Sequence, residues 1–149
     1  MDLPVSVPIV VVDTMVVVSA VIGDPGGPSA AVLDEVSTGG VRLAISDDQL
    51  SELVRVFRYP EIEEQIRRSV RAFEVALDIG YMGSMHHARR FDWPSLSDPK
   101  DSWIFDLAHA SGADYIVTYD DAVQHTARVL GFDCVLPEYL LRLLRQQRK

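Results

Sequence analysis

The stretch Val10-Val-Val-Asp13-Thr14-Met15 decides how this chain is expected to fold. Together with Ile9 it forms an unbroken apolar run, Ile9–Val12, that leads directly into an aspartate. A β-branched run without polar alternation is typical of a strand buried on both faces, as in a parallel sheet covered by helices. In such sheets ligands bind beyond the carboxyl ends of the strands. The stretch therefore predicts a central strand with Asp13 at the ligand-binding edge.

Strands and helices alternate along the rest of the chain. The predicted strands are Ile9–Val12, 41–45, 115–118 and 134–136. The predicted helices are Thr14–Ile22, 29–38, one from the Ser46 cap to about residue 57, 61–78, 100–111, 122–130 and one that starts at Pro137, with an irregular connection over 80–97. This alternation predicts an α/β fold, a three-layer α/β/α sandwich around a mostly parallel sheet.

Some of these boundaries rest on specific local signals. Ser46-Asp-Asp-Gln49 has the spacing of a capping box, and Asp98-Pro99 has that of a cap followed by proline at the first helical position. The apolar spacing over 61–78 predicts one long amphipathic helix. Its inward-facing residues would be Ile62, Ile66, Val70, Phe73 and Leu77.

Length and composition favour one domain, 1–149, in a cytoplasmic protein. The 149 residues suffice to bury a core without disulfides, and the single cysteine, Cys134, cannot form an internal one. No apolar run reaches the roughly 20 residues of a membrane span, and no basic residue precedes Arg42 as a signal peptide would require. The net charge of −8 argues against a protein that coats nucleic acid, but it is compatible with a nuclease that carries clustered carboxylates.

Four acidic residues stand at positions where strands end or helices begin. Asp13 follows the first strand, Asp120 follows the third, Asp101 lies in a first helical turn, and Glu52 lies one turn into the helix after the second strand. In a parallel sheet these positions can share one edge. Grouped carboxylates repel one another, and a hard divalent cation such as Mg²⁺ removes that repulsion. The pattern favours a metal site suited to phosphodiester hydrolysis.

Each acid also has a simpler interpretation when taken alone. Asp13 could cap a helix, and Asp101 could complement a helix dipole. Glu52 could be an ordinary solvated helix residue, while Asp120 or Asp121 could form a turn. Their joint placement, one on each predicted edge element, is what favours a site.

Four segments together resemble the PIN-domain ribonucleases, most closely the VapC-like toxin components of toxin–antitoxin pairs. The segments are Val-Val-Asp13-Thr-Met-Val-Val-Val-Ser19-Ala, Ser46-Asp-Asp-Gln-Leu-Ser-Glu52-Leu-Val-Arg-Val, Asp98-Pro-Lys-Asp101-Ser-Trp-Ile-Phe-Asp-Leu-Ala108 and Gly112-Ala-Asp-Tyr-Ile-Val-Thr-Tyr-Asp120-Asp. They occur in order and cover nearly the whole chain. Each is weakly specific by itself, and the four in register are fairly specific.

The resemblance implies an endoribonuclease that depends on Mg²⁺ or Mn²⁺. By motif match its catalytic and metal-binding residues are Asp13, Glu52, Asp101 and Asp120, with Thr118 in support and Asp98 as a peripheral candidate. It also implies an RNA substrate, a homodimer and a cognate antitoxin protein.

One position departs from the pattern of that family. Asparagine commonly stands two residues after the first aspartate, where this chain has Met15. A thioether cannot donate the hydrogen bond that an amide donates. A catalytically impaired PIN scaffold that binds protein or RNA without cutting it is therefore the alternative hypothesis.

Basic residues near the predicted site are candidate RNA contacts. They are Arg55, Arg58, Arg89 and Arg90. Arg89 and Arg90 lie close to Trp93, whose ring could stack on a base. The simpler interpretations, solvated arginines and a packed Trp93, remain open at this point.

Overall fold

A five-stranded parallel sheet forms the centre of the computed structural model, which describes residues 6–96 and 98–148. The strands are β1 (Ile9–Val12), β2 (Arg42–Ile45), β3 (Ser84–Met85), β4 (Tyr115–Val117) and β5 (Cys134–Val135). Their order across the sheet is β3-β2-β1-β4-β5, and each neighbouring pair is parallel. This order makes β1 the central strand, as its apolar sequence predicts.

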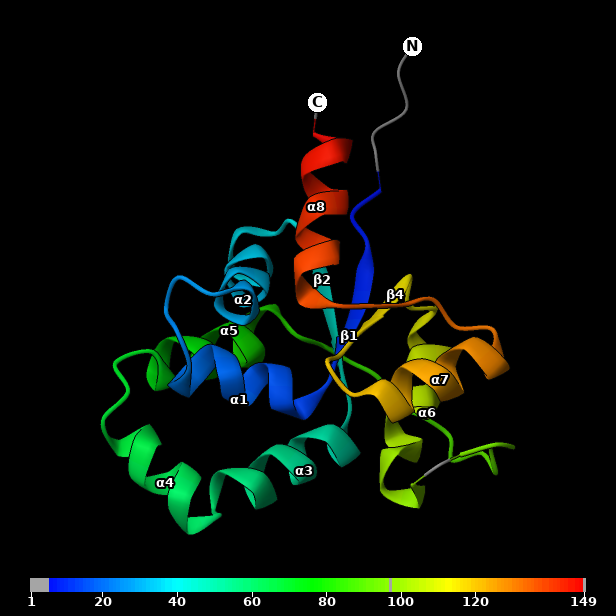
Figure 1. Cartoon of the computed structure of the whole chain (residues 1–149), viewed down its shortest axis with the longest axis horizontal. Coiled ribbons are helices and arrows are strands. Elements are labelled where there is room, and N and C mark those ends of the chain that lie inside the picture. Colours follow the sequence, from blue (N-terminus) through cyan, green and yellow to red (C-terminus); the bar gives the residue numbers. More distant parts are fainter. Residues whose placement is uncertain (1–5, 97, 149) are drawn as a thin grey trace.

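Helices connect the strands and cover both faces of the sheet (Figure 1). They are α1 (Thr14–Ile22), α2 (Pro28–Thr38), α3 (Asp47–Phe57), α4 (Pro60–Arg67), α5 (Ala72–Met82), the 3₁₀ turn η1 (Pro99–Asp101), α6 (Ser102–Ser111), α7 (Asp121–Leu130) and α8 (Pro137–Gln147). The predicted three-layer α/β architecture is confirmed. No helix in the described ranges is long and apolar enough to cross a membrane.

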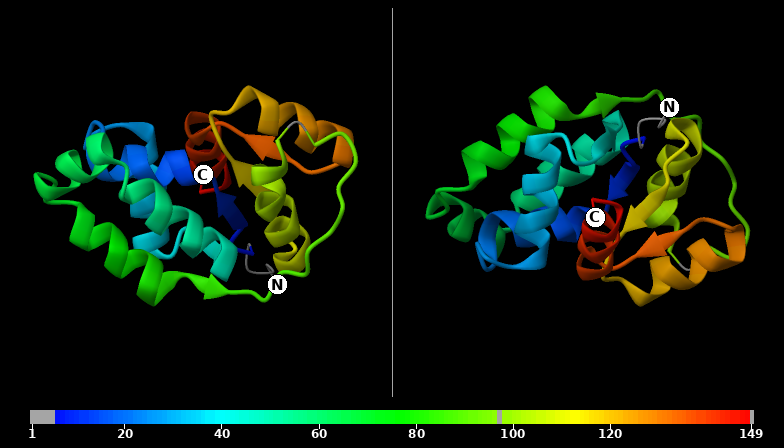
Figure 2. Two further views of the ribbon diagram at one scale, coloured as in Figure 1. Left: turned by 90° about the horizontal axis from the view of Figure 1, so that it is seen from below. Right: turned by 90° about the horizontal axis from the view of Figure 1, so that it is seen from above.

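The core consists of two apolar layers, one on each face of the sheet. Val10 and Val12 pack with α1, α2, α5 and α8, whereas Val11 packs with α6 and α7 on the opposite face. All three valines are fully buried, because successive side chains of a strand point to opposite faces and both faces are covered. Figure 2 shows these two groups of helices on opposite sides of the strands.

Local signals in the sequence end several helices as predicted. Gly39, Gly112 and Gly131 follow α2, α6 and α7 with φ of 82°, 64° and 85°, a backbone conformation that only glycine adopts at little cost. The side chain of Asp98 accepts a hydrogen bond from the Lys100 amide at 2.9 Å and so caps η1. The three glycines thus end the helices that lead into β2, β4 and β5, and Asp98 begins the turn that carries Asp101.

The prediction of one helix over 61–78 is wrong. The segment forms two helices, α4 and α5, separated near Ser69. The Ser69 hydroxyl donates to the Val21 carbonyl at 2.6 Å and accepts from the Arg71 amide at 3.2 Å, so the chain is tied to the end of α1 at the break. The break changes which residues face the core: Val75 and Ile79 are buried.

The residues that were predicted to point inward from the second half of this segment lie on the outside. Val70 is 90% exposed, Phe73 72% and Leu77 38%. The prediction extended one helical repeat from α4 into α5. Because the helix is interrupted between them, that repeat no longer identifies the buried face of α5.

The prediction of an irregular connection over 80–97 is wrong in its first part. Helix α5 continues through Gly80 to Met82, and β3 then pairs with β2, with Ala44 opposite Ser84 and Ile45 opposite Met85. Both residues of β3 are exposed, so no apolar pattern marks this strand in the sequence. Strand β3 forms because its backbone pairs with β2, and not because of a side-chain pattern of its own.

We expect Val75→Ala to lower the free energy of unfolding by about 2 kcal/mol, because Val75 is 2% exposed and the change removes buried methyl groups. The matched variant Val70→Ala should change it by less than about 0.5 kcal/mol. Urea denaturation of both variants measures the difference. Equal effects would mean that one continuous helix, with Val70 inward, describes the segment better.

Candidate functional site

The four predicted acids lie on elements that meet at the carboxyl edge of the sheet. Asp13 follows β1 directly, Asp120 precedes α7, Asp101 is the last residue of η1, and Glu52 lies on α3. Figure 1 shows the starts of α1, α3 and α7 gathered beyond the end of β1. This is the edge at which open α/β sheets bind ligands.

Asp13 is held in place by Thr118. The Thr118 hydroxyl donates to Asp13 Oδ2 at 2.6 Å and accepts from the Asp120 amide at 3.0 Å. Thr118 is fully buried, so its hydroxyl joins the two aspartates inside the protein. Burial raises the pKa of Asp13 above its ordinary value, and the hydrogen bond from Thr118 opposes that rise.

Asp120 combines two roles that the sequence left as alternatives. Its Oδ1 accepts from the amides of Ala122 at 2.8 Å and Val123 at 3.4 Å, so it caps α7. It also contributes negative charge at both Asp13 and Asp101. A helix cap placed at the sheet edge is therefore also part of the acidic group.

Asp101 carries the clearest electrostatic sign that the acids share one region. Its pKa is raised to about 6, first by burial and then by the charges of Asp13, Asp98, Asp120 and Glu52. Negative charges raise the pKa of a carboxyl group only when they lie near it, so these four acids lie near Asp101. The structure thus brings together acids that are far apart along the chain, and the charge of Asp98 also acts on Asp101.

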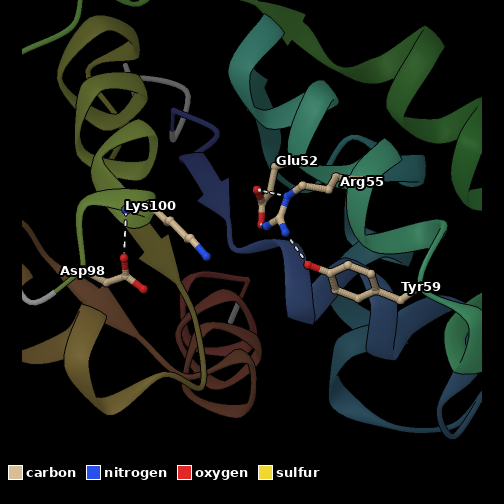
Figure 3. Close-up of polar contacts among 5 residues, drawn as sticks. All are labelled: Glu52, Arg55, Tyr59, Asp98 and Lys100. Atoms are coloured by element: carbon tan, nitrogen blue, oxygen red, sulfur yellow. Dashed lines mark hydrogen bonds and ion pairs between the residues drawn. The ribbon is translucent and has the colours of Figure 1, made fainter.

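Glu52 is not simply a solvated helix residue. Its carboxylate accepts from Arg55, at 2.7 Å from one guanidinium nitrogen and 3.3 Å from another. Arg55 also donates to the Tyr59 hydroxyl, and Figure 3 shows these three side chains together, across from Asp98 and Lys100. Glu52 therefore already has a cationic partner.

The donor chemistry of this group fits a hard divalent ion. Four carboxylates supply the oxygen ligands that Mg²⁺ and Mn²⁺ accept, and their mutual repulsion favours a bound cation. Three buried side-chain polar atoms of the described residues lack a hydrogen-bond partner: Thr14 Oγ1, Gln49 Oε1 and Arg71 Nε. In the described part of the chain no three His, Cys, Asp or Glu side chains stand close enough to hold a metal ion as they are.

Gln49 is a site residue for which the sequence indicated only a helix cap. Its Nε2 donates to the Val12 carbonyl at 2.7 Å, while the Asp13 amide donates to the Val117 carbonyl at 2.9 Å. The peptide group between Val12 and Asp13 is thus held from both sides. Gln49 is 1% exposed, so this bond is shielded from water.

The predicted capping box is only half correct. Ser46 Oγ accepts from the Gln49 amide at 3.3 Å, as expected for the cap. The side chain of Gln49 turns to β1 instead of back to Ser46. Sequence spacing cannot distinguish the two outcomes, because both place glutamine at the same position of the helix.

The four arginines that were predicted to contact RNA have different partners. Arg55 joins Glu52, whereas Arg90 pairs with Asp48 at 3.3 Å and Arg89 lies over the ring of Phe91. Arg58 follows the last residue of α3. These positions favour Arg55 among the four.

Two further residues were left with alternative interpretations by the sequence: Trp93, which could stack on a base or pack inside the protein, and Met15, which stands where the family commonly has asparagine. The Trp93 indole donates to the buried carboxylate of Asp106 at 2.8 Å and packs beside Phe105 and Phe132, as its simpler interpretation predicts. Met15 is 55% exposed on α1.

We expect Gln49→Met to lower the free energy of unfolding by about 1–3 kcal/mol, because it leaves the buried Val12 carbonyl without its donor. Gln65→Met is the matched control, since the Gln65 amide donates to the Glu61 carbonyl at an exposed position on α4. Its effect should stay below about 0.5 kcal/mol. Urea denaturation measures both variants, and equal values would contradict the role of Gln49.

Asp101 should make the protein less stable as the pH rises. Its folded-state pKa of about 6 lies above the ordinary 3.8, so the folded protein holds this proton more tightly than the unfolded chain does. Stability is therefore lost between about pH 4 and 6 as the group ionises. The full shift corresponds to about 3 kcal/mol. We expect about 1 kcal/mol, because solvent screens this partly exposed carboxyl group.

Asp101→Asn should accordingly raise the free energy of unfolding by about 1 kcal/mol at pH 7.5, and this gain should disappear below pH 4. The exposed Asp133 provides the control variant Asp133→Asn. Chemical denaturation at several pH values measures the effect. A gain that persists unchanged at pH 3.5 would show that the ionisation of Asp101 is not its cause.

A family model described as "PIN domain" matches residues 9–122. The match covers well over half of the 149 residues and includes all four acids. A comparison with curated proteins gave no match.

Proposed function

The chain belongs to the PIN-domain family, whose members are generally nucleases, and we propose that it is a metal-dependent endoribonuclease that hydrolyses RNA phosphodiester bonds. The observation that carries the proposal is the convergence of Asp13, Glu52, Asp101 and Asp120 at the carboxyl edge of the sheet, where burial and then the charges of the neighbouring acids raise the pKa of Asp101. A protein gains nothing in stability from such repulsion, so a function in binding a cation explains it.

The four acids would hold Mg²⁺ or Mn²⁺. The ion, when bound, activates water and stabilises charge on the leaving oxygen. The chain's own contribution is to orient the ligands: Thr118 directs one oxygen of Asp13, and the clamped Val12–Asp13 peptide sets the position of that residue. With a pKa of about 6, Asp101 is largely ionised at pH 7 and can serve as a ligand.

A more specific role is also proposed: the toxin of a toxin–antitoxin pair in the cytoplasm, acting as a homodimer that a cognate antitoxin restrains. The resemblance of the four motif segments to VapC-like toxins supports this role. An exposed apolar face on α5, formed by Phe73, Leu77 and Tyr81, is consistent with burial against a second protein chain.

The alternative is a PIN scaffold that binds RNA or protein without cutting. One observation favours it: the acids within the described ranges are not already at metal-binding distances from one another. The exposed Met15 is compatible with either function. Retained RNA binding together with no cleavage in Mg²⁺ or Mn²⁺ would support this alternative.

We expect the protein to cleave single-stranded RNA in Mn²⁺ or Mg²⁺ and to lose this activity in EDTA. Asp13→Asn should lower the rate by about 100-fold or more, because it removes a charged ligand. Asp121→Asn removes a neighbouring charge from α7 without touching the proposed ligand set, and it should retain activity. Gel-based cleavage of a labelled RNA, with thermal denaturation as a folding check, measures these effects. Cleavage by Asp13→Asn in EDTA would contradict the proposal.

A further inference from the structure

The ion pair between Glu52 and Arg55 lies within the proposed metal site, and this is unexpected for a metal ligand. Glu52 contributes charge at both Asp13 and Asp101, yet Arg55 already engages both of its oxygens. Glu52 must therefore give up Arg55 before both of its oxygens can bind a metal ion. The arrangement therefore suggests competition between Arg55 and a metal ion for Glu52.

The ion pair is easily broken. The Arg55 side chain is 47% exposed and that of Glu52 23%, and the two residues are three positions apart on one helix. Exposed pairs of this kind contribute little free energy, because water solvates both partners well once they separate. Breaking the pair therefore costs little free energy when Arg55 can bind another anion.

Tyr59 keeps Arg55 beside the site when the ion pair is broken. Its hydroxyl accepts from Arg55, and the guanidinium carbon lies 5.6 Å from the centre of its ring. Tyr59 immediately precedes Pro60, the first residue of α4, so its backbone is restricted. A guanidinium held in this way loses less freedom when it binds a new anion.

Lys100 lies on the other side of the same space. Figure 3 shows its side chain extending from η1 toward Glu52 and Arg55. The hydrogen bond with Asp98 is made by the backbone amide of Lys100, so it sets the direction of the turn without occupying the ammonium group. The cationic side chains of Arg55 and Lys100 thus come from opposite sides of the view in Figure 3, in a chain with a net charge of −8.

We propose that Arg55 is an exchangeable partner of Glu52: it holds the carboxylate while no RNA is bound, and when it instead binds a phosphate of single-stranded RNA it frees Glu52 to turn to the metal, with Lys100 binding a phosphate on the opposite side. The proposal rests on the proposed nuclease function and adds its substrate contacts and their coupling. Because coupling between two ligands is reciprocal, RNA and metal favour each other's binding.

The first experiment measures RNA affinity without metal. Labelled single-stranded RNA is titrated in EDTA at several salt concentrations by fluorescence anisotropy, with Arg55→Gln, Lys100→Gln and the control Arg67→Gln. The control breaks a comparable exposed pair, Arg67–Glu63 on α4, at 3.0 Å. Arg55→Gln and Lys100→Gln should each weaken binding several-fold. Each should also reduce the slope of log K against log salt concentration by about 0.7, the value for one phosphate contact on a single strand. Arg67→Gln should change neither quantity.

The second experiment measures Mn²⁺ affinity without RNA by calorimetry. Arg55→Gln should raise this affinity several-fold, because Glu52 no longer has a competing cation, whereas Arg67→Gln should leave it unchanged. Opposite changes in RNA and Mn²⁺ affinity are the specific prediction, since a merely misfolded variant would lose both. Weaker RNA binding with unchanged Mn²⁺ affinity would make Arg55 a fixed contact and would overturn the exchange.

These outcomes are separate from the test of nuclease activity. If no RNA is cleaved and the opposite changes are observed, the exchange stands and the nuclease proposal fails. If RNA is cleaved and Arg55→Gln behaves like Arg67→Gln in both titrations, the nuclease proposal stands and the exchange is overturned.

Discussion

The peptide group between Val12 and Asp13 is the point on which the acidic edge depends. Gln49 from α3 binds its carbonyl, and the Val117 carbonyl of β4 binds its amide. These two bonds fix α3 and β4 relative to the end of β1. The position of Glu52 follows from α3, and that of Thr118 and Asp120 follows from β4. One buried peptide thus relates most of the acidic residues to one another.

Asp13 lies where the apolar interior meets the acidic edge, and burial there disfavours the charge that a metal ligand needs. Strand β1 is buried because both of its faces pack against helices, yet its last peptide leads into a carboxyl group whose pKa burial raises. The hydrogen bond from Thr118 to Asp13 and the ion pair of Glu52 with Arg55 offset part of the cost. The remaining repulsion, visible at Asp101, is the property that a bound cation would relieve.

The sequence predicted some elements well and others poorly for identifiable reasons. Glycines 39, 112 and 131 end their helices where expected, because a left-handed backbone is a local property of glycine. The break near Ser69 was missed, since it depends on a hydrogen bond to Val21, 48 positions away. Strand β3 was missed because pairing with β2 forms it, and the register of α5 was wrong as a consequence of the break.

The sequence by itself determined the parallel α/β architecture and the candidacy of the four acids, because apolar runs, caps and strand ends are encoded within a few neighbouring residues. Only the tertiary structure decided how those acids are supported. The turn of Gln49 toward Val12, the pairing of Glu52 with Arg55 and the direction of Lys100 depend on which elements meet in space. A side chain with several possible partners takes the one that folding brings within reach, and local spacing does not specify that choice.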